Sequence, residues 1–241
     1  MPHDDTSVWE LDDTYELHIR ERDLDLTVPE KIHIEQLWKE EIARRNGHLF
    51  NNPLLVFEEM EGTHVYARYI EYKQYIGILR DRNLRKRFPI YPLGVSGLLV
   101  GEDFILFGRR AEHVTLYPGW WELAPAGVID KTHLGGDGRV NFIGQLLEEL
   151  HEETGLAANS IAQTRPLALI LDKKENTYDL CVELQCNLTA EDMAPPGEPL
   201  TSHEYTAMAC VAKDGVGQFV AEHREGIIPT SVAMLETAEL I

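Results

Sequence analysis

Residues 143–156 read Ile-Gly-Gln-Leu-Leu-Glu-Glu-Leu-His-Glu-Glu-Thr-Gly-Leu, and this stretch decides the fold. Its apolar residues recur at i, i+3, i+4 and i+7, and they are Ile143, Leu146, Leu147 and Leu150. This spacing predicts a helix with one apolar stripe. We expect Glu149, Glu152 and Glu153 to cluster on the opposite side, and Gly155 to end the helix.

The three acids of this helix repel one another. Like charges three and four residues apart destabilise a helix, and negative charge near its C-terminal end opposes the helix dipole. A divalent cation would reverse this balance, because hard cations bind carboxylate oxygens and share them with substrate phosphates. The spacing alone favours a plain solvated acidic face, and a site for Mg²⁺, or for Mn²⁺ in its place, is the alternative.

The composition excludes several classes of protein. Forty-one acidic and 22 basic residues among 241 give a net charge of −19, which disfavours nucleic acid and anionic membranes as partners. The N-terminus has no secretory pattern, and no apolar run reaches membrane-spanning length, so we expect a soluble, cytoplasmic protein. Three cysteines without a C-x-x-C pair argue against a disulfide framework and against a zinc site.

The chain upstream of the helix divides near two prolines, Pro89 and Pro92. We expect an accessory domain over residues 1–90 and a catalytic-type α/β domain over 91–241. The accessory domain should begin as a loose tail with a strand near Tyr15–Arg20, then form a helix from Pro29 and two strands joined at Gly62. The basic island, residues 80–87, carries five cations in an acidic chain; it is either a solvated linker or a patch for an anionic substrate.

The segment Pro118-Gly119-Trp120-Trp121 to Asp130, together with 149–156, resembles the Nudix hydrolases. The signature of that family runs G-x5-E-x7-R-E-U-x-E-E-x-G-U, where U is aliphatic. Its second half is matched in register by Glu149, Leu150, Glu152, Glu153, Gly155 and Leu156. The resemblance implies a Nudix-type α/β/α sandwich with a mixed sheet, preceded here by a small α+β accessory domain.

The first half of the signature departs from the family pattern. The spacing from Gly127 to position 148 is seven residues longer than the signature's, and the excess falls within Lys131–Arg139. Val140 stands where the pattern has a glutamate, and Glu148 stands where it has an arginine. In the family that arginine orients a metal-binding glutamate, so its replacement by Glu148 leaves the arrangement of the metal ligands open.

The N-terminal segment contains four short motifs: Trp38–Glu41, Leu49–Asn52, Tyr69–Gly77 and Tyr91–Val95. In these motifs it resembles the UDP-sugar diphosphatases of the family, which also carry an accessory domain and a long insertion. This implies metal-dependent hydrolysis of a nucleoside diphosphate-linked compound, a UDP-sugar, to a nucleoside monophosphate and a sugar phosphate. Two alternatives stay open: hydrolysis of ADP-ribose or another nucleotide diphosphate, and a binding or regulatory protein that has lost activity. A homodimer is also left open.

The resemblance implies roles for particular residues. Glu149 and Glu153 should be the principal metal ligands, with Glu152 next and the carbonyl of Ala126 completing the shell. Glu152 and Glu204 are the expected catalytic acids, and Glu198 is an alternative general base. The expected substrate-binding residues are Tyr72, Lys73, Tyr75, Arg85, Arg87 and Arg109. The tyrosines would stack on a base, although ordinary core packing is the favoured explanation for them.

Overall fold

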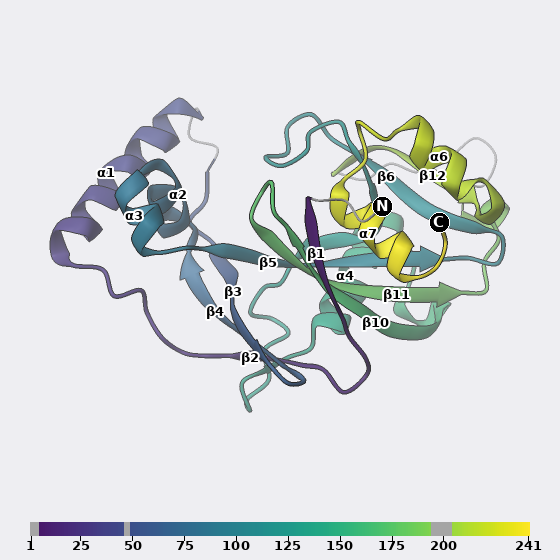
Figure 1. Cartoon of the computed structure of the whole chain (residues 1–241), viewed down its shortest axis with the longest axis horizontal. Helices are drawn as coiled ribbons and strands as arrows, with labels where there is room; N and C mark the ends of the chain where they lie inside the picture. The colour runs from purple at the N-terminus through teal and green to yellow at the C-terminus, as the bar shows by residue number, and fades with distance from the viewer. Residues whose placement is uncertain (1–4, 46–48, 194–203) are drawn as a thin grey trace. The chain divides into compact units, whose positions relative to one another are not determined.

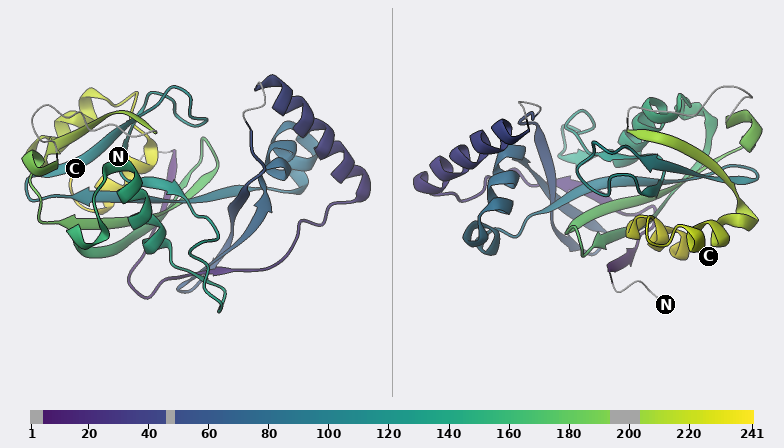
Figure 2. Two further views of the ribbon diagram at one scale, coloured as in Figure 1. Left: turned by 180° about the vertical axis from the view of Figure 1, so that it is seen from behind. Right: turned by 90° about the horizontal axis from the view of Figure 1, so that it is seen from above.

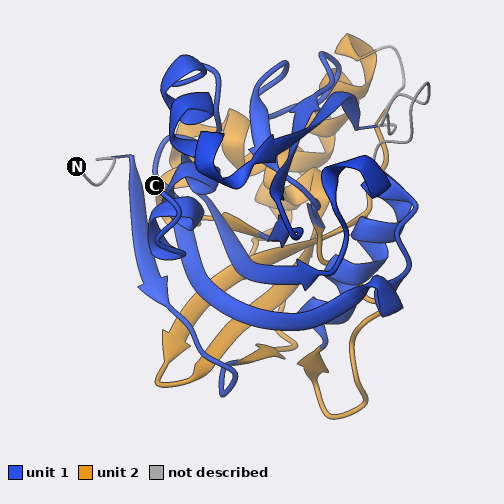
Figure 3. Cartoon of the chain, turned by 90° about the vertical axis from the view of Figure 1, so that its right-hand side faces the viewer, with its two compact units in different colours: residues 1–15, 94–127, 141–241 blue, residues 16–93, 128–140 orange. Residues whose placement is uncertain are grey.

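The computed structural model describes residues 5–45, 49–193 and 204–241 of the chain. These residues form two compact units, coloured separately in Figure 3. Unit 1 contains residues 1–15, 94–127 and 141–241, and unit 2 contains residues 16–93 and 128–140. The chain therefore passes between the units four times.

Unit 1 is built on antiparallel strands. Its strands are β1 (Thr6–Glu10), β6 (Phe104–Arg110), β7 (Trp121–Leu123), β8 (Ala126–Val128), β10 (Ile161–Asp172), β11 (Thr177–Cys186) and β12 (Tyr205–Ala212). β10 lies between β1 and β11, and β6 pairs with both β12 and β7. The long strand β5 (Tyr91–Val100) begins in unit 2 and continues into unit 1, where Val100 pairs with Ile105 of β6.

Helices cover both faces of these strands, as the right-hand view of Figure 2 shows for α4 (Phe142–Thr154) and α7 (Pro229–Thr237). Met234 and Leu235 of α7 and Val216 of α6 (Val216–Glu222) are buried against Phe107 and Ile170 of the strands. The short helix α5 (Ala190–Met193) contacts β12. Burial of these apolar faces stabilises the layered arrangement.

Unit 2 combines paired strands with a group of helices (Figure 1). The hairpin β3 (Pro53–Glu61) and β4 (His64–Glu71) turns at Gly62, whose φ of +60° suits glycine. β4 also pairs in parallel with β2 (Glu16–Ile19), which in turn pairs with β9 (Arg139–Val140). The parallel pair makes the sheet a mixed one.

The helices of unit 2 are α1 (Val28–Arg44), α2 (Tyr72–Arg80) and α3 (Arg82–Arg87). α1 begins with a capping box, in which Thr27 and Glu30 bond to each other's backbone N–H groups. Ile34 of α1 packs with Ile78 of α2 and Leu84 of α3 in a separate core. Unit 2 therefore has a hydrophobic interior of its own.

The α/β class, the mixed sheet, the helix from Pro29 and the hairpin turn at Gly62 are confirmed. The loose N-terminal tail is wrong: residues 6–10 form β1, because an exposed edge of β10 accepts the strand. The two units also do not follow the expected division into 1–90 and 91–241, since residues 1–15 belong to unit 1 and 128–140 to unit 2. In the part of the chain described, no helix is both long and apolar enough to span a membrane.

Candidate active site

Helix α4 carries the acidic residues of the site, and both of its ends are capped. The side chain of Asn141 accepts a hydrogen bond of 2.9 Å from the backbone N–H of Gly144. Gly155, with φ of +76°, ends the helix as expected. These caps define where the helix begins and ends.

The acids of α4 do not share one solvated face. Glu153 is only 6% exposed and lies on the buried face with Leu146 and Leu150, whereas Glu149 is half-buried and Glu152 is exposed. The expectation that Glu153 lies opposite the apolar stripe is wrong. Residues seven apart on a helix differ by only about 20° in direction, so Glu153 points the same way as Leu146.

Glu153 is a buried carboxylate without a full set of partners. Burial raises its pKa to about 9, and the negative charges of Glu122, Glu204 and Glu149 add to this effect. The backbone N–H of Ala126 donates to Oε1 over 3.5 Å. Oε2 is shielded from solvent and has no hydrogen-bond partner among the described residues. An orphaned oxygen of this kind is a suitable ligand for a cation.

Glu149 lies one turn earlier on α4. Burial raises its pKa to about 7; the charges of Glu204, Glu152 and Glu148 contribute, and a 3.0 Å hydrogen bond from Gln145 opposes the rise. The carboxylate lies directly against Gly127, where a Cβ atom would come within 2.2 Å of Cδ and Oε1 of Glu149. Only glycine at position 127 leaves room for the carboxylate in this orientation.

Gly127 provides a first test of this arrangement. We expect Gly127→Ala to displace the Glu149 carboxylate while the flexible side chain spares the fold, and so to lower Mg²⁺ affinity and turnover by about 10- to 100-fold. Gly217→Ala is the matched control, because a Cβ there meets nothing within 4 Å. Mg²⁺ titration of turnover, with thermal unfolding, measures both effects. Equal Mg²⁺ affinity in the two variants would show that the contact with Gly127 does not position the Glu149 carboxylate.

Glu122 is a site residue that the sequence analysis missed. It lies on β7, is 6% exposed, and accepts a 2.5 Å hydrogen bond from Nη1 of Arg110. Burial raises its pKa despite the arginine, and its charge in turn raises the pKa of Glu153. The only sequence signal is an acid between Trp121 and Leu123 in an otherwise apolar strand.

Glu204 completes a group of four carboxylates. It is exposed just before β12, and its charge raises the pKa of Glu122, Glu149 and Glu153, so it lies near all three. The alternative base Glu198 lies outside the described residues. We define the acid group as Glu122, Glu149, Glu153 and Glu204, all in unit 1.

The expected substrate-binding residues on α2 already have protein partners. Nζ of Lys73 lies 3.3 Å from Glu35 and 3.2 Å from Glu71. Tyr72 is half-buried, packs edge-on against Trp38 at 6.1 Å and neighbours Tyr75 at 6.0 Å. The contact with Trp38 agrees with the alternative explanation of Tyr72 as an ordinary core residue.

The basic island is partly neutralised by α1. Arg87 pairs with Glu30 at 2.5 Å, and Arg80 lies 3.4 Å from Glu40. Arg85 is exposed and makes no ion pair among the described residues. In unit 1, Arg109 is exposed on β6, and its Nε donates to the carbonyl of Gly119 over 3.1 Å.

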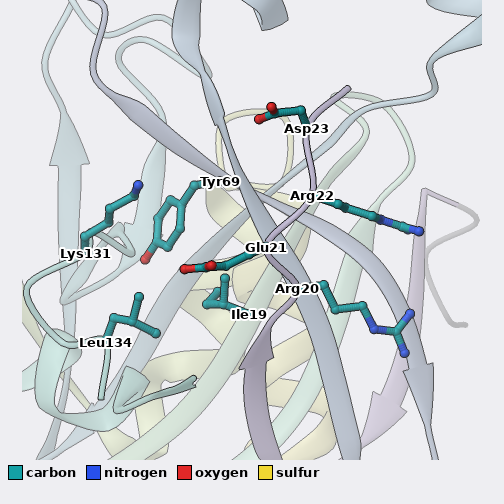
Figure 4. A pocket seen from close by; sticks show the side chains of 8 residues that line it. All are labelled: Ile19, Arg20, Glu21, Arg22, Asp23, Tyr69, Lys131 and Leu134. Carbon is teal, nitrogen blue, oxygen red and sulfur yellow. The ribbon is translucent and has the colours of Figure 1, made fainter. Parts of the chain in front are cut away.

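A pocket of about 360 Å³ lies within unit 2 (Figure 4). Its lining residues are Ile19, Arg20, Glu21, Arg22, Asp23, Tyr69, Lys131 and Leu134. Arg20 and Arg22 pair with Glu59 and Glu58, and Nζ of Lys131 lies 5.0 Å from the centre of the Tyr69 ring. None of the expected substrate-binding residues lines this pocket.

No protein-family model matches the chain, and no curated protein matches it. Among solved structures, the NUDIX domain of Shewanella oneidensis NrtR, complexed with ADP ribose, shares 18% identity over 67% of this chain and 94% of that one, with a TM-score of 0.45. A MutT protein from Methanosarcina mazei Go1 shares 17% over 62% and 94%, with a TM-score of 0.41. A bifunctional NMN adenylyltransferase/ADP ribose pyrophosphatase from Francisella tularensis, complexed with AMP and an Mn ion, shares 15% over 70% and 49%, with a TM-score of 0.45. Values this low do not by themselves assign an activity.

Proposed function

We propose that this protein is a Nudix hydrolase that cleaves a nucleoside diphosphate-linked compound. The proposed substrate is a UDP-sugar, and the products are a nucleoside monophosphate and a sugar phosphate. The observation that carries this proposal is the acid group of unit 1, in which the charges of Glu122, Glu149 and Glu204 raise the pKa of the buried Glu153. Arg110 pairs with one member of the group, Glu122. The register of Glu149, Glu152 and Glu153 with the Nudix signature supports it further.

The acid group fits a hard divalent cation. Its donors are carboxylate oxygens, one of them the orphaned Oε2 of Glu153, and such donors suit Mg²⁺ or Mn²⁺. Glu149 and Glu153 would hold the ion, with Glu152 and the carbonyl of Ala126 as further ligands. A bound ion of this kind neutralises phosphate charge and lowers the pKa of water.

Other residues of the acid group and its neighbours would accept a proton and orient the metal ligands. Glu204 is exposed beside the two ligands, and we assign it the role of general base that accepts a proton from the attacking water. Arg110 holds Glu122 in place through an ion pair, and the interaction of Glu122 with Glu153 contributes to the raised pKa of Glu153. Gln145 fixes Oε1 of Glu149 through its amide. These contacts orient the carboxylates before substrate arrives.

The basic island is proposed to attract the diphosphate, because the rest of the surface repels anions. We expect Arg85→Gln together with Arg87→Gln to raise KM about 3- to 10-fold, with a loss of kcat/KM that shrinks at high salt. Arg87→Gln also breaks the ion pair with Glu30 and so changes the structure as well as the charge. Arg85→Gln alone therefore measures the effect of the charge on substrate binding without the loss of that ion pair. Steady-state kinetics at two salt concentrations provide the measurement; unchanged kinetics would make the island a solvated linker.

The test of the function is a hydrolysis panel with the full chain and Mg²⁺. UDP-glucose, UDP-galactose and ADP-ribose are offered at equal concentration, and released monophosphates are separated by chromatography. We expect the highest kcat/KM for a UDP-sugar, with ¹⁸O from labelled water in one of the two phosphate products. Preferential cleavage of ADP-ribose would show that the proposed substrate is wrong and that the proposed reaction class is right. Binding of these compounds without any turnover would show that the chain is a binding protein and not an enzyme for them.

A further inference from the structure

Three potential metal ligands meet on one face of the sheet in unit 2, away from the sequence motifs discussed so far. Glu16 and His18 lie two residues apart on β2, so their side chains point to the same face. His64 opens β4, the neighbouring parallel strand, and is the register partner of Glu16. β2 and β4 lie side by side in Figure 1.

The three donor atoms are close enough to share one ion. Nε2 of His18 lies 2.9 Å from Oε2 of Glu16, and Nδ1 of His64 lies 3.6 Å from the same oxygen. All three donor atoms lie within 4.8 Å of one another. Ligands of a tetrahedral ion at bond lengths of about 2.0–2.1 Å are separated by similar distances, so small side-chain rotations would complete the geometry.

A second observation concerns Nδ1 of His64. This atom is shielded from solvent and has no hydrogen-bond partner among the described residues. It faces the Glu16 oxygen from just beyond hydrogen-bonding distance. A shielded ring nitrogen beside a carboxylate lacks the partner that a buried polar atom requires, and a metal ion supplies one.

The surroundings favour the same assignment. Nη1 of Arg139 lies 2.8 Å from Oε1 of Glu16, the oxygen that the two histidines do not approach. The arginine thus fixes the carboxylate and leaves Oε2 turned to the histidines, as an outer-shell partner does. The ring of Tyr66 lies beside both histidines, 5.8 Å from His18 and 6.2 Å from His64, and limits their movement.

We propose that Glu16, His18 and His64 form a Zn²⁺ site. Two imidazole nitrogens and one carboxylate oxygen suit a borderline ion such as Zn²⁺, whereas the all-oxygen acid group of unit 1 suits Mg²⁺. The cysteine count argued against zinc, but this site uses no cysteine. Its ligands are separated by 46 residues in the chain, which is why sequence inspection did not find it.

The ion would fasten two short strands, β2 and β9. β2 has four residues and β9 two, and His18 pairs with Arg139 of β9. β9 ends the insertion in Lys131–Arg139 that lengthens the Nudix signature. An ion that ties β2 to β4 would therefore also hold this insertion in place, which gives the site a structural role.

The test is a Zn²⁺ titration of the full chain, stripped with a chelator and then supplied with excess Mg²⁺ to occupy the acid group. We expect calorimetry to give about one equivalent with a Kd near 1 µM or tighter, and a rise in Tm. Substituting Co²⁺ should give the intense visible bands of a four-coordinate site. His64→Ala and His18→Ala should each weaken binding by at least about 100-fold.

The matched control is His33→Ala, which removes an exposed histidine of α1 that pairs with Asp81 at 3.0 Å. It should bind Zn²⁺ as the natural chain does. Glu16→Gln keeps both histidines and should weaken binding less than their loss, so it decides the matter if a histidine variant fails to fold. Absence of binding by the natural chain, or full binding by folded His64→Ala, would overturn the proposal. Either result is independent of whether the chain hydrolyses a diphosphate.

Discussion

The Glu153→Gln variant is expected to lose turnover by about 10²- to 10³-fold, yet to unfold at a higher temperature than the natural chain when metal is absent. Turnover falls because the variant lacks the buried carboxylate that we propose as a principal ligand. Stability rises because burial raises the pKa of Glu153 to about 9, so at neutral pH the folded chain must take up a proton that the unfolded chain has released, whereas glutamine is neutral in both states. Hydrolysis at saturating Mg²⁺ and calorimetric unfolding in chelator measure the two effects.

Two further variants make this result specific. Glu225→Gln removes the same charge from an exposed side chain and should leave both measurements unchanged. Glu148→Ala should alter activity only about 2- to 5-fold. Glu148 is exposed, and its negative charge affects the site by helping to raise the pKa of Glu149. A loss equal to that of Glu153→Gln would instead make Glu148 a ligand. A fully active Glu153→Gln enzyme would refute the metal assignment.

The second large effect is the pH dependence of stability in the metal-free protein. The folded state raises the pKa of Glu149 to about 7 and that of Glu153 to about 9, whereas an unfolded glutamate titrates near 4.3. Between these values the folded chain holds protons that the unfolded chain has released. The free energy of unfolding must therefore fall as pH rises from about 5 to 9, by on the order of several kcal/mol.

Thermal unfolding in chelator at pH 5, 7 and 9 measures this effect. We expect Tm to fall by roughly 10 °C over this range in the natural chain and by less than half as much in Glu153→Gln. The difference between the two proteins isolates the buried carboxylate from the general repulsion of an acidic chain. Excess Mg²⁺ should reduce the slope in the natural chain, because bound ions keep the carboxylates ionised. Identical slopes in both proteins would show that Glu153 does not carry the effect.

The elements that local sequence specifies could be predicted. Helical periodicity and Gly155 place the acid helix correctly, and alternation around Gly62 places the hairpin of β3 and β4. Each of these signals acts over a few residues. The α/β class follows because such elements must pack their apolar faces in layers.

The composition of the site could be predicted only in part, because burial is a tertiary property. The signature identifies Glu149 and Glu153, but only packing shows that Glu153 is inside and Glu152 outside. Glu122 has no helical or motif context, and its role depends on Arg110 from another strand. The pairing of strands far apart in the sequence, such as β1 with β10, also cannot be predicted from local sequence patterns.

The pairing of β1 with β10 affects the order in which the chain can fold during synthesis. Strand β1, Thr6–Glu10, leaves the ribosome well before its partner Ile161–Asp172, which follows some 150 residues later. Unit 2 likewise stays incomplete until residues 128–140 have been made. Closing such long loops is slow and leaves strand edges open to other chains. A fragment begun at residue 91 would keep that edge of β10 exposed permanently, and we expect it to aggregate.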